Sequence, residues 1–122
     1  MLIEKPISLG DIVSFKLNSG EELVARMDNE TPMKFGDIVS FKLNSGEELV
    51  ARLDGESSTE YTLYKPMVLI MQQQGLGLAP FMFGVSPDAK FELQTHAVSC
   101  RAKTEDEISK QYTAATSNIQ IQ

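Results

Sequence analysis

The sequence predicts a mainly β fold: a small, strongly bent five-stranded antiparallel barrel with one C-terminal helix, preceded by a duplicated β-hairpin. Three observations predict it. Apolar and polar residues alternate with a period of two over residues 36–53, which is typical of strands with one buried face. Near the end of the chain, polar residues 104–107 open a stretch with helical apolar spacing. Residues 10–26 repeat residues 36–52 letter for letter.

The repeat divides the chain into two parts. Residues 1–26 are predicted to be an appended partial copy of the first hairpin, and residues 27–122 to be the complete barrel domain. Identity over this length indicates a recent duplication, a cloning artefact or deliberate engineering, because old copies would have diverged, and two copies are too few for a solenoid. One alternative stays open: the first hairpin adds strands to a sheet edge or swaps into a neighbouring molecule, since a free apolar strand face needs a cover.

The first two strands of the domain are predicted on either side of the turn Asn44-Ser45-Gly46. Asn tolerates a turn position, and Gly46 can take the positive φ that a short hairpin loop requires. The alternation gives the pair one apolar face, made of Val39, Phe41, Leu43, Leu49, Ala51 and Leu53. A two-stranded ribbon is marginally stable alone, so later strands must cover this face.

The third strand is predicted from Tyr61 to Met71, with a bulge or bend at Pro66, because proline cannot donate a hydrogen bond to a ladder. Residues 67–71 are apolar without alternation, which indicates that both faces of this part are covered. The barrel core covers one face, and the helix or another subunit is expected on the other.

The last two strands follow a glycine-punctuated connection at residues 72–80. A fourth strand is predicted at Phe81–Val85, before the turn at residues 86–89. The fifth runs from Phe91 to Lys103, and its apolar phase slips in the middle, which predicts a bulge or bend near residues 94–96.

The single helix is predicted over residues 104–117. Thr104 and Glu107 have the spacing of a capping box, and the acidic residues 105–107 suit the positive end of the helix dipole. An apolar stripe at helical spacing is formed by Ile108, Tyr112, Ala115 and Ile119. Residues 117–122 are expected to fray.

Composition restricts the class of protein. The chain has 122 residues, a net charge of −6 and one cysteine, so one domain without an internal disulfide framework is expected. It has no apolar run of membrane-spanning length and no secretory signal pattern, so a reducing cytoplasm is predicted. The acidity argues against a simple basic nucleic-acid binder, but residues 61–103 carry a local balance of +2.

The sequence offers little catalytic chemistry. His96 and Cys100 are the only histidine and cysteine, and on a continuous strand they would lie roughly 13 Å apart, too far for a catalytic pair. Two such residues also fall short of a zinc site. Gly75-Leu76-Gly77 lacks the third glycine of a phosphate-binding loop. We therefore expect no enzyme activity, no metal and no cofactor.

The stretch Gly36–Leu53 resembles the first strand pair of an Sm-like (LSm) domain, a barrel of the SH3-like kind. Residues 64–69, residues 75–83 and the C-terminal helix are similar to the Sm-like proteins of marine cyanophages and T4-type phages. The resemblance covers residues 34 to about 116. It implies a homo-oligomeric ring of about five to seven subunits in the cytoplasm of a bacterial host.

The ring implied by the resemblance joins the fourth strand of one subunit to the fifth strand of the next. The interface residues would then be Phe81, Phe83, Val85, Val98 and Cys100. It leaves the number of subunits open, and it implies no membrane partner.

Family members bind single-stranded RNA near the pore, which here implies single-stranded RNA or DNA as the ligand. Tyr64 is the nearest match to a stacking platform, Lys65 and Lys90 match phosphate contacts, and His96 is a further contact. The chain departs from the family because residues 61–67 lack the usual Asp and Met-Asn signature, and residues 86–90 lack the Arg-Gly pair. The alternative is a protein-interaction scaffold ring that binds no nucleic acid.

Overall fold

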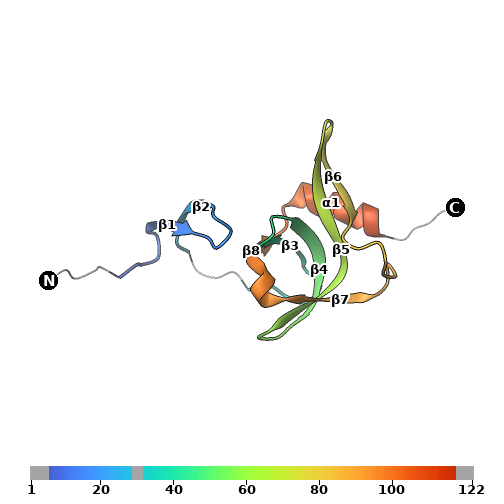
Figure 1. Ribbon diagram of the computed structural model, residues 1–122, viewed down its shortest axis with the longest axis horizontal. Coiled ribbons are helices and arrows are strands. Elements are labelled where there is room, and N and C mark those ends of the chain that lie inside the picture. Colours follow the sequence, from blue (N-terminus) through green and yellow to red (C-terminus); the bar gives the residue numbers. More distant parts are fainter. Residues whose placement is uncertain (1–5, 29–31, 118–122) are drawn as a thin grey trace. The chain divides into compact units, whose positions relative to one another are not determined.

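The computed structural model describes residues 6–28 and 32–117, and the predicted fraying of the last residues lies mostly outside these ranges (Figure 1). The chain separates into two compact units, residues 1–32 and 33–122. Both are built from antiparallel strands, and the described part has one α-helix, near its C-terminal end. The prediction of a mainly β fold with a C-terminal helix is confirmed.

The first unit is a single hairpin of strands β1 (Ile12–Lys16) and β2 (Glu22–Arg26). The two strands pair antiparallel, with Ile12 opposite Arg26 and Lys16 opposite Glu22. The turn needs a left-handed residue, and Gly20 supplies it with φ +104°. The local sequence therefore folds this segment as predicted.

The second unit contains the remaining strands and both helical elements. In chain order these are β3 (Ile38–Leu43), β4 (Glu48–Glu56), β5 (Glu60–Gln72), β6 (Gly75–Pro80), β7 (Lys90–Gln94), the 3₁₀ turn η1 (Thr95–Ala97), β8 (Val98–Lys103) and α1 (Asp106–Thr116). Hydrogen-bonded neighbours follow the order β6-β5-β4-β3-β8, and β7 pairs separately with β5. This unit holds all the residues that the sequence assigned to a site.

The prediction of a closed five-stranded barrel is wrong. The described residues form eight strands in two sheets, and their ladders do not close into a ring of strands. The segment predicted as one fifth strand is divided by η1, so β7 pairs with β5 and β8 pairs with β3. The first half of β5 pairs with β7 through Tyr64 opposite Lys90, and its second half pairs with β6 through Met67 opposite Pro80. One strand thus serves two different partners along its length.

The core of the second unit lies where the predicted apolar hairpin face meets later strands. Val39, Phe41 and Leu49 are fully buried, and Leu63 of β5 packs with them. Partly buried side chains of β7 and β8, among them Phe91 and Val98, pack against this cluster. The predicted apolar face of the hairpin is confirmed.

A second, smaller cluster lies on the other face of the sheet. Ile108 and Tyr112 of α1 pack with Val50 of β4, and the partly buried Met67 and Leu69 of β5 join them. The expectation of a covered second face therefore holds for the first part of residues 67–71. The helix does not cover Ile70 and Met71, which are exposed at the end of β5 that leads into the β5–β6 hairpin. Cover of these two residues by another subunit stays a prediction.

The predicted fourth strand at residues 81–85 is wrong. These residues have no strand structure, and the strand lies instead at Gly75–Pro80, where a flexible connection was expected. The turn around Gln73 and Gln74 brings Gln72 opposite Gly75, which has φ +122°, so a tight hairpin forms.

Two other predicted irregularities occur as expected. β5 has a bulge beside Pro66. Val50 of β4 lies opposite Met67 and Arg52 lies opposite Tyr64, so between these pairs β5 has one residue more than β4. The expected bend near residues 94–96 is the turn η1, which separates β7 from β8.

The helix α1 begins slightly later than predicted. Its N-cap is Glu105, whose side chain accepts from the backbone N–H of Glu107, so the predicted capping box is wrong. The hydroxyl of Thr104 instead hydrogen-bonds to that of Ser40 at 2.8 Å, linking β3 to the start of the helix. Tertiary contact thus displaces the cap by one residue.

Candidate nucleic-acid interface

The bulge in β5 positions the first candidate residues. Arg52 of β4 lies opposite Tyr64 and Val50 lies opposite Met67, so Lys65 and Pro66 together face one residue of β4. Lys65 has φ +52°, a left-handed conformation that no other described non-glycine residue takes. Such conformations cost energy and persist where the surrounding structure holds them.

The bulge and the β5–β7 ladder bring three predicted site residues together. Tyr64 lies directly opposite Lys90 in the ladder. The Lys65 ammonium lies 5.2 Å from the centre of the Tyr64 ring, within range of a cation–π contact. We call Tyr64, Lys65 and Lys90 the tyrosine–lysine cluster. It combines one aromatic face with two positive charges.

Both ammonium groups of the cluster have intramolecular partners. Lys90 Nζ donates to Asp54 Oδ2 at 2.8 Å, and this hydrogen bond raises the pKa of Lys90 above its ordinary value. Lys65 Nζ donates to the carbonyl of Thr116 at 2.8 Å, at the negative end of α1. The Lys90–Asp54 pair is exposed on both sides, and solvent screens such pairs strongly, so a phosphate can compete for the lysine.

Tyr112 ties α1 to the bulge. Its hydroxyl is 2.9 Å from the carbonyl oxygen of Tyr64 and 2.8 Å from that of Lys65, and it donates to this pair. The side chain is fully buried. The helix therefore holds the backbone of Tyr64 and Lys65, two residues of the tyrosine–lysine cluster, in place.

Replacing Tyr112 by Phe is expected to lower the free energy of unfolding by about 1–3 kcal/mol, because the two carbonyls lose their shared donor. Burial raises the pKa of Tyr112 from 10.0 to about 12. A raised pKa means that this contribution is complete below pH 10.0 and is lost as the pH rises to about 12. Urea unfolding at a series of alkaline pH values should show that the free energy of unfolding falls more steeply with pH for the parent protein than for Tyr112→Phe. Parallel curves would contradict this assignment.

His96 does not belong to the tyrosine–lysine cluster. It lies exposed in η1, past the end of β7 that is remote from Lys90. Its carbonyl accepts from Asn44 Nδ2 at 2.7 Å, and Asn44 Oδ1 accepts from the Ser99 hydroxyl at 2.6 Å. This histidine therefore belongs to the contact between the β3–β4 turn and η1.

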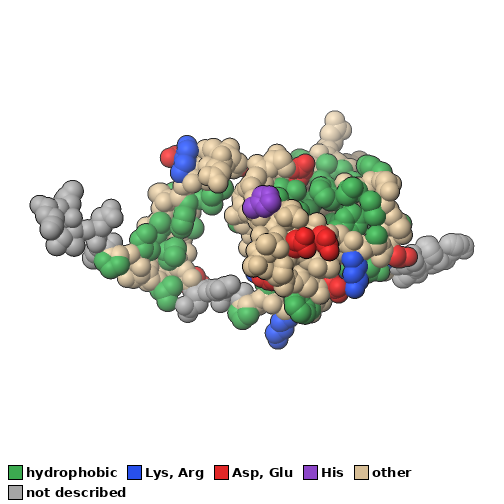
Figure 2. All heavy atoms as spheres, turned by 60° about the horizontal axis from the view of Figure 1, so that its bottom comes forward, with side chains coloured by type: hydrophobic (Ala, Val, Ile, Leu, Met, Phe, Trp, Pro, Cys, Tyr) green, Lys and Arg blue, Asp and Glu red, His purple; other side chains and the backbone are tan. Residues whose placement is uncertain are grey.

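The predicted interface residues are divided between two environments. Phe83 and Val85 lie exposed in the segment between β6 and β7, and Cys100 is exposed on β8. Phe81 and Val98 are partly buried against the core. Figure 2 shows hydrophobic side chains gathered over one face of the second unit. The exposed apolar residues between positions 70 and 85 are Ile70, Met71, Leu76, Met82, Phe83 and Val85.

A groove of about 450 Å³ is lined both by Lys65 of the tyrosine–lysine cluster and by residues of the exposed apolar segment. Its wall is mainly apolar and includes Phe83 and Phe91, while Lys65 and Asp88 supply the charges. The end of α1 closes one side through Thr116. The groove therefore extends from Lys65 of the tyrosine–lysine cluster to Met82, Phe83 and Val85 of the exposed apolar segment.

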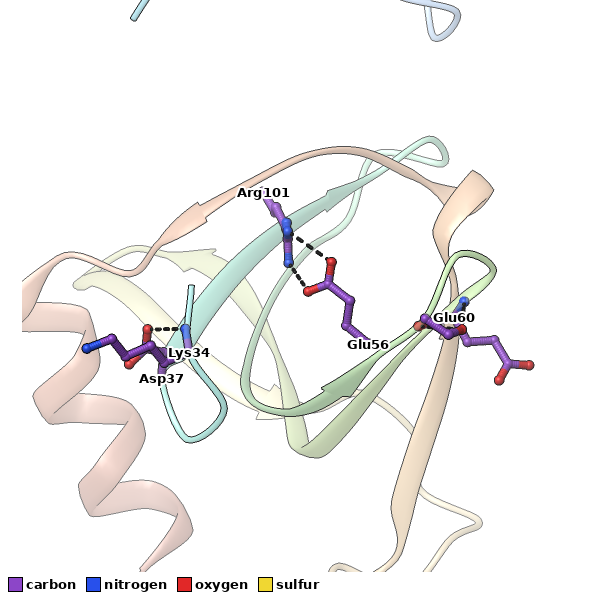
Figure 3. A network of polar contacts seen from close by, with 6 residues as sticks. Lys34, Asp37, Glu56, Glu60 and Arg101 are labelled. Atoms are coloured by element: carbon purple, nitrogen blue, oxygen red, sulfur yellow. Dashed lines mark hydrogen bonds and ion pairs between the residues drawn. The ribbon is translucent and has the colours of Figure 1, made fainter. Parts of the chain in front are cut away.

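A second pairing of an aromatic ring with a cation was not predicted from the sequence. Arg101 of β8 forms two hydrogen bonds to the Glu56 carboxylate of β4, at 3.1 and 3.3 Å (Figure 3). Its guanidinium also lies 4.9 Å from the centre of the Tyr61 ring. Three strands contribute to this contact, so no local sequence signal could have identified it.

A scan against protein-family models finds no match for this chain. A search of curated proteins finds no match either. Residues 6–28 and 32–117 contain no helix long and apolar enough to cross a membrane, and no group of three or more metal-binding side chains. The function therefore has to be inferred from the chain's own residues.

Proposed function

We propose that this chain forms a homo-oligomeric Sm-like ring that binds single-stranded RNA or DNA with little sequence specificity. The tyrosine–lysine cluster is the observation that carries the proposal. A tyrosine face stacks on any base, and two ammonium groups contact the phosphates on either side. The resemblance of residues 34–116 to Sm-like domains supports the same ligand.

Assembly is supported by the edges and apolar surface of the second unit. Within the described ranges, β6 pairs only with β5 and β8 pairs only with β3, so each has a second edge for a neighbouring subunit. Exposed apolar side chains at residues 70–85 lie at the end of β5, on β6 and in the segment that follows β6. Apolar surface of this kind marks protein–protein contact sites. The ring would join the β6 edge of one subunit to the β8 edge of the next.

The double variant Lys65→Ala, Lys90→Ala is expected to weaken binding of a fluorescent U-rich RNA at least tenfold at low salt. Each lysine–phosphate contact contributes about −0.7 to the slope of log K against log salt, so the slope should flatten by about 1.4. Fluorescence anisotropy over a salt series measures both quantities. Lys110→Ala, which removes an exposed lysine from α1, is the matched control and should change neither. Parent-like affinity in the double variant would refute the proposed site.

A second candidate function is a scaffold ring that binds a protein and no nucleic acid. It is favoured by the net charge of −6 and by the intramolecular partners of Lys65 and Lys90. The two candidates differ in one measurement, in which light scattering is combined with titration of RNA and single-stranded DNA. A closed oligomer with salt-dependent binding supports the first candidate, and a closed oligomer without binding supports the second.

A further inference from the structure

The two copies of the repeated sequence adopt the same hairpin. Ile12 lies opposite Arg26 in the first copy, and Ile38 lies opposite Arg52 in the second. The contacts at the hairpin base also match: the arginine donates to the carbonyl of Gly10 at 3.0 Å in one copy, and to that of Gly36 at 2.9 Å in the other. The hairpin geometry is therefore a property of the local sequence.

The repeat extends beyond its identical part. Residues 6–30 align with residues 32–56, with proline at the start and Asp-X-Glu at the end of both. Met27 stands where the second copy has the buried Leu53, a volume-conserving exchange. Asn29 stands where the second copy has Gly55, and a Cβ added at Gly55 would meet Thr62 at 3.5 Å, an ordinary contact. At these two differing positions the first copy's residues are compatible with the second copy's place.

The copies differ in what covers them. Val50 is 0% exposed and its counterpart Val24 is 70% exposed. Phe41 is 0% exposed, whereas its counterpart Phe15 is 39% exposed. Most side chains that bury the second copy come from β5 to β8, from Phe81 between β6 and β7, and from α1, and only Met33 comes from the chain before the hairpin. We call residues 57–117, which contain these elements, the frame. The frame is the one surface known to fit this hairpin sequence.

We propose that β1–β2 is an exchangeable copy of β3–β4, which can take its place between β5 and β8 of the same chain. In the exchanged state Lys16 replaces Lys42 opposite Cys100, and Phe15 replaces Phe41 opposite Arg101. The displaced hairpin then becomes the exposed copy. Each state buries one hairpin and exposes the other.

The connection to β5 decides the balance between the two states. In the observed state the three residues 57–59 join β4 to β5, and the Ser57 N–H donates to the Glu60 carbonyl at 2.8 Å. In the exchanged state residues 31–59 would form this connection. The entropy of closing the longer loop favours the observed state by roughly 30-fold, which leaves the exchanged state at about 3%. Exchange within one chain has no concentration dependence, whereas insertion into a second molecule does.

A disulfide trap detects the exchanged state. Lys42 and Cys100 are directly opposite across β3 and β8, and opposite residues lie within disulfide range. In the exchanged state the variant Lys16→Cys therefore lies within disulfide range of Cys100. Each protein is incubated with oxidised glutathione and analysed by non-reducing gel and peptide mass mapping. Lys42→Cys is the positive control, and Glu22→Cys, on the other strand of the hairpin, measures random collision.

We expect Lys16→Cys to form an intrachain link to Cys100 more slowly than Lys42→Cys, but well above the Glu22→Cys control. A link only between chains would overturn exchange within one chain and would assign the hairpin to a second copy. No link above the collision control would overturn the exchange altogether.

A rescue experiment tests the same inference through folding. Phe41→Asp places a carboxylate in the core, which should reduce the folding equilibrium constant more than about 1000-fold if no substitute exists. With the first copy available, the loss should be limited to roughly 30-fold. Phe15→Asp should leave stability unchanged, and the double variant should lose cooperative unfolding. Equal loss in Phe41→Asp and the double variant, measured by urea unfolding, would refute the rescue.

Discussion

The variant Phe83→Asp is expected to be monomeric at concentrations where the proposed ring assembles. Phe83 is 86% exposed and belongs to the exposed apolar segment that directly follows β6. Burial of a phenylalanine side chain at an interface contributes about 1.5–3 kcal/mol, and an unpaired carboxylate in its place adds a desolvation cost. Each subunit contact should therefore weaken by at least about 100-fold, and a ring multiplies that loss over all its contacts.

Sedimentation velocity and light scattering on both proteins measure this effect. Phe35→Asp is the matched control, because Phe35 is also an exposed phenylalanine but lies before β3, outside the segment at residues 70–85. The control should assemble like the parent. If Phe83→Asp retains the parent's oligomeric mass, the proposed subunit contact is wrong.

The variant Leu63→Ala is expected to lower the free energy of unfolding by about 2–5 kcal/mol, the range for leucine truncation in a packed core. Leu63 is 1% exposed and packs with Val39, Phe41 and Leu49 at the centre of the main cluster. It stands on β5, outside the repeated sequence, so neither hairpin copy can compensate for its loss. A small domain has only about 5–15 kcal/mol of stability, so this single change should shift the transition strongly.

Urea unfolding followed by circular dichroism gives the midpoint and slope for this comparison. Leu76→Ala is the control, because Leu76 of β6 is 44% exposed and its truncation should change stability by less than about 1 kcal/mol. Equal midpoints for Leu63→Ala and the parent would mean that the main cluster does not stabilise the fold.

Local sequence was sufficient for some elements and insufficient for others. The β3–β4 hairpin was predictable because alternation, the turn at residues 44–46 and Gly46 all act within a few residues of one another. The fourth strand was not, because Phe81–Val85 has the composition of a strand but no partner edge, whereas Gly75–Pro80 lies against the second half of β5. Strand formation depends on a neighbour that sequence pattern alone does not identify.

The candidate site likewise combines features that local sequence predicts with features that depend on strand pairing. Tyr64 and Lys65 were predictable as neighbours in a strand with a bulge at Pro66, but their meeting with Lys90 depends on the β5–β7 register. His96 was predicted as a fourth contact and lies apart from them, because η1 turns the chain away after β7. Side chains distant in sequence are brought together by register, and a shift of one residue would move each to the opposite face.

The duplicated hairpin shows which features follow from local sequence and which require a partner surface. Residues 10–26 and 36–52 share one sequence and one strand register, because turn chemistry and cross-strand pairing are local. Only the second copy is buried, since it lies next to the frame along the chain and closes onto β5 through a short turn. Hydrophobic burial requires a partner surface, and the entropy of the connecting loop favours the nearer copy. Sequence therefore determined the hairpin, and chain connectivity in the folded structure decided which copy became the core.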